Sequence, residues 1–333
     1  MKVGIIGCGL IGRKRASALD KDDILVAACD TNKEVAEAFA STFDCPVFTD
    51  PSALISKTDC EIIIVAVVNK FILGITEEAL KLGKHVLAEK PLGRNASESK
   101  RMVDAALLNN RILKTGFNHR FHPALSKAKA MFDDGQIGKL LFIRGRYGHG
   151  GRPGMEKEWR ASKDLCGGGE LLDQGVHLID LSRWFAGDIR TAFGKVRTKF
   201  WDMEVEDNAF ILLESIDKVD IQLQVSWTNW KNIFSMEIFG SDGYLKIEGL
   251  GGSYGPETLE FGKRRTEGGR PDIELFEFPP EDISWNKEWN EFKQAIRNGC
   301  EPIGNGMDGH RANEIIEALY ASSERGTIIE LVT

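Results

Sequence analysis

Several features are missing from this sequence of 333 residues, and each absence argues against a class of protein. No apolar run approaches the ~20 residues that a membrane-spanning helix needs. Met1-Lys2 leads directly into a strand pattern, so we expect no secretory leader. The net charge is -7 and no basic tract offsets it, which argues against a nucleic-acid partner. These absences predict a cytoplasmic protein that binds neither a membrane nor nucleic acid.

Cysteines at metal-binding or redox spacing are missing as well. The six cysteines are scattered without a CxxC motif, which is typical of reduced thiols in the cytoplasm. Cys166 stands beside a run of glycines and could be a catalytic thiol, but the burial habit of free cysteine favours a packing role. Histidines and cysteines form no cluster with zinc-ligand spacing, so we expect no metal ion.

The sequence does contain a glycine loop in a specific setting. A short apolar strand, Lys2–Ile6, leads into GCGLIG at 7–12, and a helical stretch and a second strand, Ile24–Cys29, follow. The acid Asp30 ends this second strand, close to the ~20 positions after the loop that are typical of a dinucleotide-binding fold. A lone GxGxxG is a weak signal, but the complete order of elements favours dinucleotide binding over a chance turn. The predicted cofactor contacts of this segment are Gly7, Gly9, Leu10, Ile11, Gly12 and Asp30.

Asp30, directly after the second strand, indicates which nicotinamide cofactor is bound, NAD or NADP. We expect the Asp30 carboxylate to accept hydrogen bonds from the adenosine ribose and to repel a 2′-phosphate. Thr31-Asn32 supplies no arginine to offset this charge, so NAD is favoured over NADP, and Lys33 is the residue that argues for NADP. FAD is a weaker alternative, because nothing downstream indicates a flavin site.

Strand and helix patterns alternate through about residue 118, which predicts a doubly wound parallel sheet, that is, an α/β Rossmann domain. After the first two strands, the predicted strands are 47–48, 61–68, 85–88 and 112–116, and the predicted helices are 33–43, 51–55, 71–82 and 96–109.

The later part of the chain is rich in strands without helices between them, so we predict an α+β domain with an open, mainly antiparallel sheet. The expected domains are 1–118 and 119–333. In the second domain the predicted strands are 139–146, 192–199, 207–214, 219–228, 233–240, 243–248 and 258–262, and the predicted helices are 123–133, 170–186, 285–298 and 309–325.

Glu89-Lys90-Pro91 ends a predicted parallel strand. On composition alone it is a loop with a solvated lysine. Doubly wound folds, however, place ligands at the carboxyl ends of their strands, so Lys90 becomes a candidate for binding a substrate hydroxyl during hydride transfer. Pro91 can fix the backbone of the lysine through a cis bond.

Asp173 and His177 follow three glycines, in GGGELLDQGVHLID at 167–180. The i, i+4 spacing places both side chains on one face of a helix, where a carboxylate can orient an imidazole for general-base catalysis. A surface pair or a zinc-ligand set is the alternative, and the setting favours catalysis. Asp180 could be a further orienting group or a salt-bridge partner, and we favour the salt bridge.

Other polar residues are candidates for substrate binding. Trp159 and Arg160 suit a polar ring by stacking and hydrogen bonding, although a core tryptophan with a surface arginine fits equally well. Residues 118–122 follow the sixth strand, and we expect at least one of His119, Arg120 and His122 to face the substrate; Asn118 and Arg120 are our substrate-binding candidates. The glycine-rich stretch 148–154, with His149 and Arg152, could close over a substrate.

Together these motifs resemble the Gfo/Idh/MocA family, which includes glucose–fructose oxidoreductase and inositol 2-dehydrogenase. The resemblance rests on GCGLIG, Asp30, AEKPLG at 88–93, GFNHRF at 116–121, the 167–180 segment and the closing segments from 289, and it spans nearly the whole chain. It implies a Rossmann domain followed by a domain with an open sheet that often mediates oligomerisation, so we expect a homodimer or homotetramer.

The family resemblance also implies roles for individual residues. Lys90 matches the lysine that contacts the substrate hydroxyl and the nicotinamide ribose, and His177 matches the proton-transferring residue. Asp173 matches its partner carboxylate, which also contacts substrate. Asn69 and Glu89 join the cofactor contacts. Around 67–72 this chain lacks the proline and histidine that the family often has, so we expect its cofactor contacts there to differ from those of the family.

These observations predict an NAD-dependent dehydrogenase that reversibly oxidises a secondary hydroxyl of a sugar, sugar nucleotide or cyclitol to a ketone. His177 is the expected acid/base, with Lys90 and Asp173 beside it. Two alternatives stay open: an NAD-dependent glycosidase that oxidises its substrate transiently, and a sensor of sugar and NAD without catalysis. The sequence does not specify which sugar or cyclitol is bound.

Overall fold

The computed structural model describes residues 1–331 and divides into two compact units. The first unit comprises Met1–Asn118, Asp164–Gly167 and Trp285–Asn313. The second comprises His119–Lys163, Gly168–Ser284 and the chain from Glu314 onward. The first boundary lies at residue 118, where the sequence predicted a division, but two later segments return to the first unit. The sequence patterns did not indicate these returns.

The first unit is built on a six-stranded parallel sheet in the order β3-β2-β1-β4-β5-β6, which confirms the predicted Rossmann topology. Its strands are β1 (Lys2–Ile6), β2 (Ile24–Cys29), β3 (Val47–Phe48), β4 (Ile62–Val65), β5 (His85–Ala88) and β6 (Leu113–Thr115). Its helices are α1 (Leu10–Ser17), α2 (Lys33–Phe43), α3 (Pro51–Lys57), α4 (Asn69–Lys81), α5 (Ala96–Leu108), α7 (Lys163–Cys166, whose first residue lies in the second unit) and α9 (Ser284–Asn298, which also begins at the last residue of that unit).

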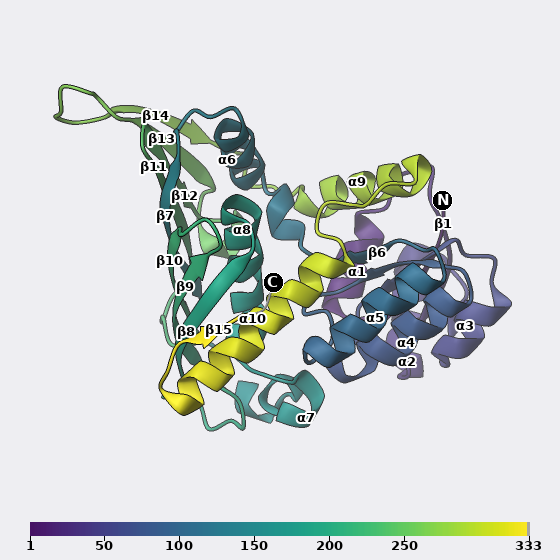
Figure 1. Cartoon of the computed structure of the whole chain (residues 1–333). Coiled ribbons are helices and arrows are strands. Elements are labelled where there is room, and N and C mark those ends of the chain that lie inside the picture. Colours follow the sequence, from purple (N-terminus) through teal and green to yellow (C-terminus); the bar gives the residue numbers. More distant parts are fainter. Residues whose placement is uncertain (332–333) are drawn as a thin grey trace. The chain divides into compact units, whose positions relative to one another are not determined.

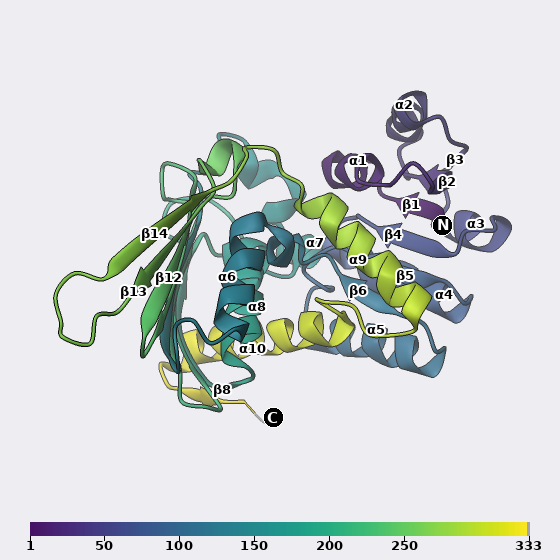
Figure 2. The same cartoon turned by 90° about the horizontal axis from the view of Figure 1, so that it is seen from above.

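Both faces of this sheet are buried, as a doubly wound fold requires. Side chains such as Ile63 and Val65 pack with Leu80 of α4 and Met102 of α5. On the other face, Ile64 and its neighbours pack with residues of α2 and with Trp289 and Phe292 of α9. Figures 1 and 2 show the helices of this unit around its strands.

Buried charges tie α9 to the rest of the first unit. Arg15 of α1 is only 2% exposed, and its guanidinium binds Glu89 at 2.6 Å and also Glu288 of α9. Lys114 of β6 is fully buried and lies 3.0 Å from Glu291 of the same helix. Since an unpaired buried charge is strongly destabilising, these pairs fix where α9 docks.

The second unit is built on a nine-stranded sheet in the order β14-β13-β12-β11-β7-β10-β9-β8-β15. Strands β7 and β10 pair in parallel, whereas the other strand pairs described in this sheet are antiparallel, as predicted. The strands are β7 (Leu140–Gly148), β8 (Ile189–Arg197), β9 (Asn208–Ser215), β10 (Asp220–Ser226), β11 (Ile233–Gly240), β12 (Gly243–Glu248), β13 (Thr258–Lys263), β14 (Asp272–Glu277) and β15 (Ile329–Glu330).

Helices cover one face of this sheet. They are α6 (Pro123–Asp133), α8 (Val176–Ala186) and the later part of α10 (Gly306–Arg325), and Figure 2 shows α6 and α8 on the same side. In β9, Ile211 and Leu213 point to this buried face, while Phe210 and Leu212 on the opposite face are 50% and 53% exposed. The alternation gives the sheet one covered and one open face.

The glycine run at 167–169 lets the chain approach a neighbouring loop closely. A Cβ atom on Gly169 would overlap the backbone of Glu206, which follows β8, and one on Gly168 would overlap the Tyr320 hydroxyl. Glu206 is buried there, where its carboxylate accepts hydrogen bonds from Tyr320 Oη at 2.8 Å and from the amide of Leu171 at 3.1 Å. Burial raises the pKa of this carboxyl group.

Some local features differ from the sequence-based expectations. The predicted helix 170–186 begins with a π-helix, η4 (Leu171–Gly175), and becomes an α-helix only at Val176. Strands β14 and β15 were not predicted: the side chains of β14 are almost all exposed, and β15 has only two residues.

Glu206→Gln should remove a pH dependence of stability. Because the pKa of Glu206 is raised on folding, the folded protein keeps a proton that the unfolded chain loses above pH ~4.3, so wild-type stability falls as pH rises through this window. Glutamine keeps an acceptor for Tyr320 but does not ionise. We expect the variant to gain stability relative to wild type as the pH rises from 4 to 7, measured by urea unfolding.

The control is Glu324→Gln, at an exposed position of α10, which should leave the pH dependence as it is in wild type. A constant difference in stability between the Glu206 variant and wild type at all pH values would contradict the prediction.

Candidate active site

The glycine loop has the geometry of a dinucleotide cradle. Gly7 has φ +100°, and a Cβ atom there would overlap the carbonyl of Ala66 after β4. A Cβ on Gly12 would overlap the carbonyl of Gly7, so both positions exclude side chains. Gly9, in contrast, has open space where its Cβ would lie, and no side chain caps the α1 N-terminus that follows it. Free amides and the helix dipole make this end a site for an anion such as a pyrophosphate.

Asp30 lies at the end of β2, beside this loop. One carboxylate oxygen accepts a hydrogen bond from the amide of Cys8 at 3.0 Å, and the other accepts from the amide of Asn32 at 2.9 Å. These bonds hold the acid at the position where a dinucleotide fold binds the adenosine ribose. Lys33, three positions after Asp30, is directed to Glu37 at 3.6 Å. The residues present therefore fit NAD.

Lys90 is half-buried directly after β5, and the bond between it and Pro91 is cis. The preceding side chain, Glu89, is anchored by Arg15, whose Nε donates to it at 2.6 Å. The Lys90 amide donates to the other Glu89 oxygen at 3.3 Å. The Glu89 carboxylate is thus engaged in holding the strand end, and its predicted cofactor contact stays a prediction.

Asn69 begins α4 and is 7% exposed. Its side-chain amide donates to the carbonyl of Cys166 at 2.8 Å, which joins the segment 164–167 to the first unit. Cys166 itself is buried, as the packing interpretation predicted. Leu10 is 72% exposed at the start of α1, beside the cradle. The roles of Asn69, Leu10 and Ile11 toward a cofactor stay predictions.

His177 lies in the second unit, within a buried cluster of rings. It is 3% exposed, and its imidazole stacks on that of His119, with ring centroids 3.7 Å apart and planes 16° from parallel. His119 belongs to the 3-10 helix η1 (Asn118–Phe121) and is 7% exposed. The sequence placed His119 among three residues of which at least one was expected to face a substrate, and it did not indicate this stack.

Two tyrosines extend the cluster. Tyr147 of β7 lies with its hydroxyl 3.0 Å from Nε2 of His119. Its hydroxyl is also hydrogen-bonded to Tyr254, which in turn accepts from the side-chain amide of Gln174 at 2.9 Å. Burial raises the pKa of Tyr254 to about 12 and raises that of Tyr147 well above its ordinary value, so both hydroxyls keep their hydrogens at neutral pH.

Asp173 lies in the π-helix η4, at the edge of this cluster. Its carboxylate is 3.8 Å from Nε of Arg160, whose guanidinium lies over the Trp159 ring at 4.4 Å. His149 follows β7. Burial lowers the pKa of its imidazole, and the nearby charge of Asp173 partly opposes this shift. The predicted residues Asp173, Trp159 and Arg160 are therefore brought together, with the 148–154 loop beside them.

Arg120 points into the interior of the second unit. It is 5% exposed and binds both carboxylate oxygens of Asp180, at 2.6 and 2.8 Å. Asp180 is therefore a salt-bridge partner, the role favoured for it. The expected contacts of Arg120 and of Asn118, which is 5% exposed, with a substrate stay predictions.

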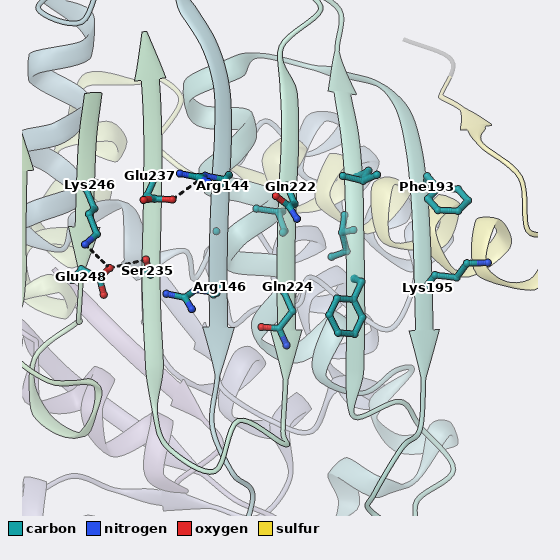
Figure 3. Close-up of a pocket in the computed structure, with 15 residues that line it drawn as sticks. Arg144, Arg146, Phe193, Lys195, Gln222, Gln224, Ser235, Glu237, Lys246 and Glu248 are labelled. Carbon is teal, nitrogen blue, oxygen red and sulfur yellow. Dashed lines mark hydrogen bonds and ion pairs between the residues drawn. The ribbon is translucent and has the colours of Figure 1, made fainter. Parts of the chain in front are cut away.

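A broad hollow lies on the open face of the nine-stranded sheet (Figure 3). Charges of both signs alternate across its central strands: Arg144 pairs with Glu237 at 3.0 Å, and Lys246 with Glu248 at 3.2 Å. Apolar side chains of β8 and β9 line the neighbouring part. This face lies across the sheet from the covering helices and is separate from the histidine cluster.

Sequence reasoning missed several residues of these sites. In the sequence, Arg15 looks like an ordinary charged residue of a helix, and no neighbouring residue indicates that its side chain is buried. Tyr147 and Tyr254 stand in a strand and in a glycine-rich turn without a motif. The one available signal was the turn GLGGSYG at 249–255, because clustered glycines favour a loop that can approach a site closely.

In the part of the chain that the structure describes, no helix is long and apolar enough to cross a membrane. Within residues 1–331, three or more metal-ligating side chains do not gather at any one point.

Comparison with known proteins gives matches to two family models. Residues 1–117 match an oxidoreductase family with an NAD-binding Rossmann fold, and residues 125–246 match the GFO/IDH/MocA C-terminal domain.

Individual relatives are similar over different lengths. Levoglucosan dehydrogenase of Pseudarthrobacter phenanthrenivorans is 32% identical over 56% of this chain and 52% of its own length. Inositol 2-dehydrogenase 2 of Saccharopolyspora erythraea is 27% identical over 98% and 94% of the two chains. D-glucoside 3-dehydrogenase of Escherichia coli is 25% identical over 99% and 97%.

A solved structure of levoglucosan dehydrogenase with NADH and levoglucosan has the same fold, with a TM-score of 0.91 at 22% identity over 99% of each chain.

Alanine at Gly9 and at Gly12 should have different effects. Gly9→Ala places its methyl group in open space, so we expect an unchanged Tm but at least tenfold weaker NADH binding, because the methyl group occupies the approach to the pyrophosphate. Gly12→Ala overlaps the Gly7 carbonyl and should lower the Tm as well. Thermal melts and NADH fluorescence titrations measure both effects. Equal Tm losses in the two variants would contradict the assignment.

Proposed function

The chain belongs to the Gfo/Idh/MocA family of oxidoreductases, and from this premise we propose that it is an NAD-dependent dehydrogenase. The proposed reaction is the reversible oxidation of a secondary hydroxyl of a sugar, sugar nucleotide or cyclitol to a ketone. The observation that carries the proposal is the presence, in one compact unit, of a complete dinucleotide cradle and of Lys90 at a strand end held by the Arg15–Glu89 ion pair. The named relatives act on levoglucosan, inositol and glucosides, which supports this substrate class.

The proposed mechanism gives each candidate side chain a role. Bound NAD supplies the hydride acceptor. His177 accepts the hydroxyl proton as general base, and Lys90 Nζ donates a hydrogen bond to the same oxygen as its charge develops. Asp173 orients the substrate, and Trp159 with Arg160 binds its ring by stacking and hydrogen bonds. Asp30 binds the adenosine ribose, and amides of residues 9–12 bind the pyrophosphate.

We expect His177→Ala and Lys90→Ala each to lower kcat by a factor of about 10²–10⁴ on a substrate found in a panel of sugars, sugar nucleotides and inositols, measured by NADH formation. NADH affinity of His177→Ala should match wild type, because that residue is outside the cradle. Variants with kcat within a few-fold of wild type would contradict the roles assigned. Glycoside cleavage without net NADH release would favour the glycosidase, and binding without turnover of any kind would favour a sensor.

We further propose that two copies of the chain associate through the open face of the nine-stranded sheet. Exposed Phe210 and Leu212 lie beside alternating charges of both signs, and a surface of this kind can be complementary to itself across a twofold axis. The occupant that fits this face is therefore a second copy of the same chain.

Leu212→Lys should convert the oligomer into a monomer, because it places an additional charge in the apolar part of this face. Sedimentation velocity measures the change. Leu108→Lys, at a position of α5 that is 85% exposed in the other unit, is the matched control and should sediment as wild type does. An unchanged oligomer in the Leu212 variant, or a wild-type monomer, would contradict the proposal.

A further inference from the structure

The stacked imidazoles of His119 and His177 are close enough to influence each other's charge. Their centroids are 3.7 Å apart, and the rings are 7% and 3% exposed. Water therefore screens the pair poorly, and two positive charges at this separation repel strongly. Such a pair takes up its protons in two separate steps that belong to the pair rather than to either residue.

A chain of hydroxyl groups holds His119 from the side. Its Nε2 lies 3.0 Å from the Tyr147 hydroxyl, which is hydrogen-bonded to Tyr254, and Tyr254 accepts from Gln174. A hydroxyl is both donor and acceptor, so Tyr147 can donate to a neutral His119 and accept from a protonated one by turning its hydrogen. The chain therefore supports either protonation state of His119.

We propose that His119 is a positioning residue for His177, and that the two stacked rings share one positive charge, which His119 takes first. The inference deepens the proposed function and rests on it for the catalytic role of His177. When His119 carries the charge, a second charge on His177 is unfavourable. His177 therefore stays neutral, and able to act as a base, to a lower pH than it would alone.

The charged groups around the pair favour His119 as the first site. Glu170, which directly precedes η4, and Asp173 within it act electrostatically on Tyr147 and Tyr254, so the hydroxyl chain lies in a negative potential that stabilises a cation at its end. On the His119 segment itself, His122 stands edge-on at 5.5 Å. Its ring lies 3.0 Å from a carboxylate oxygen of Glu257 and 3.9 Å from one of Asp282. The β11 neighbour, Phe234, is uncharged.

The test is a titration of the histidine rings by NMR on the full chain with saturating NAD+. With six histidines in the sequence, isotope-labelled rings are assigned by single substitutions. In wild type, the chemical shift of the His177 ring plotted against pH should show two inflections. One comes from protonation of His177 itself and the other from protonation of the stacked His119 ring. In His119→Phe, which keeps an aromatic ring but has no charge, a single inflection should appear about one pH unit or more above the lower wild-type one.

Two further variants make the outcome decisive. Tyr147→Phe removes the oxygen that accepts from protonated His119, so the lower His177 inflection should again move up, and this variant decides if His119→Phe does not fold. Tyr244→Phe removes a hydroxyl that donates to Glu260 elsewhere in the same sheet, and it should leave the titration unchanged.

The charge sharing is overturned if the His177 titration in His119→Phe is the same as in wild type. If only Tyr147→Phe folds, the same result in that variant overturns it. Where a substrate is turned over, the acid limb of kcat/KM should shift by the same amount as the NMR inflection. A shifted titration in a protein that turns over no sugar or cyclitol contradicts the proposed function and leaves the charge sharing standing. Turnover together with an unshifted titration contradicts the charge sharing alone.

Discussion

The ion pairs of Arg15 are the interaction on which the first unit depends most. One guanidinium on α1 binds Glu89 at the end of β5 and Glu288 on α9. Breaking a buried pair of this kind typically costs about 3–5 kcal/mol, because a charge is left without its partner. The helix that begins at the glycine loop and the strand end that carries Lys90 are therefore held in one arrangement. A single buried cation connects nucleotide binding to the position of the lysine.

Much of the fold was predictable because burial on both faces leaves a clear pattern in the sequence. The strand His85–Ala88 is found with the predicted bounds, since it is apolar and lies between a glycine stop and the EKP motif. Strand β14 was not predictable, because it forms by pairing with β13 and not by burying its side chains. The π-helix η4 around Asp173 was not predicted either. Over only five residues, an α-helix and a π-helix place apolar side chains on nearly the same face, so the sequence pattern does not distinguish them.

The sequence made His177 a candidate through its glycines and its spacing from Asp173, both of which are local. It did not identify what surrounds the imidazole, because His119, Tyr147 and Tyr254 come from three distant segments and meet only after the sheet has formed. Arg120 shows that a residue proposed for a site can also have a structural contact that the sequence does not reveal. It was a candidate for substrate binding, yet its guanidinium is bound by Asp180, sixty positions along the chain, in a pair that stabilises the same unit.

The return of 285–313 to the first unit has a consequence for how this chain can be divided. A fragment ending at residue 118 would contain the whole parallel sheet but not Glu288 and Glu291, the acids that neutralise Arg15 and Lys114. It would also leave uncovered the sheet face on which Trp289 and Phe292 pack. The nucleotide-binding half is therefore not a portable module that can be excised at the end of its last strand. A transplantable version has to carry α9 with it, joined by a linker in place of the intervening chain.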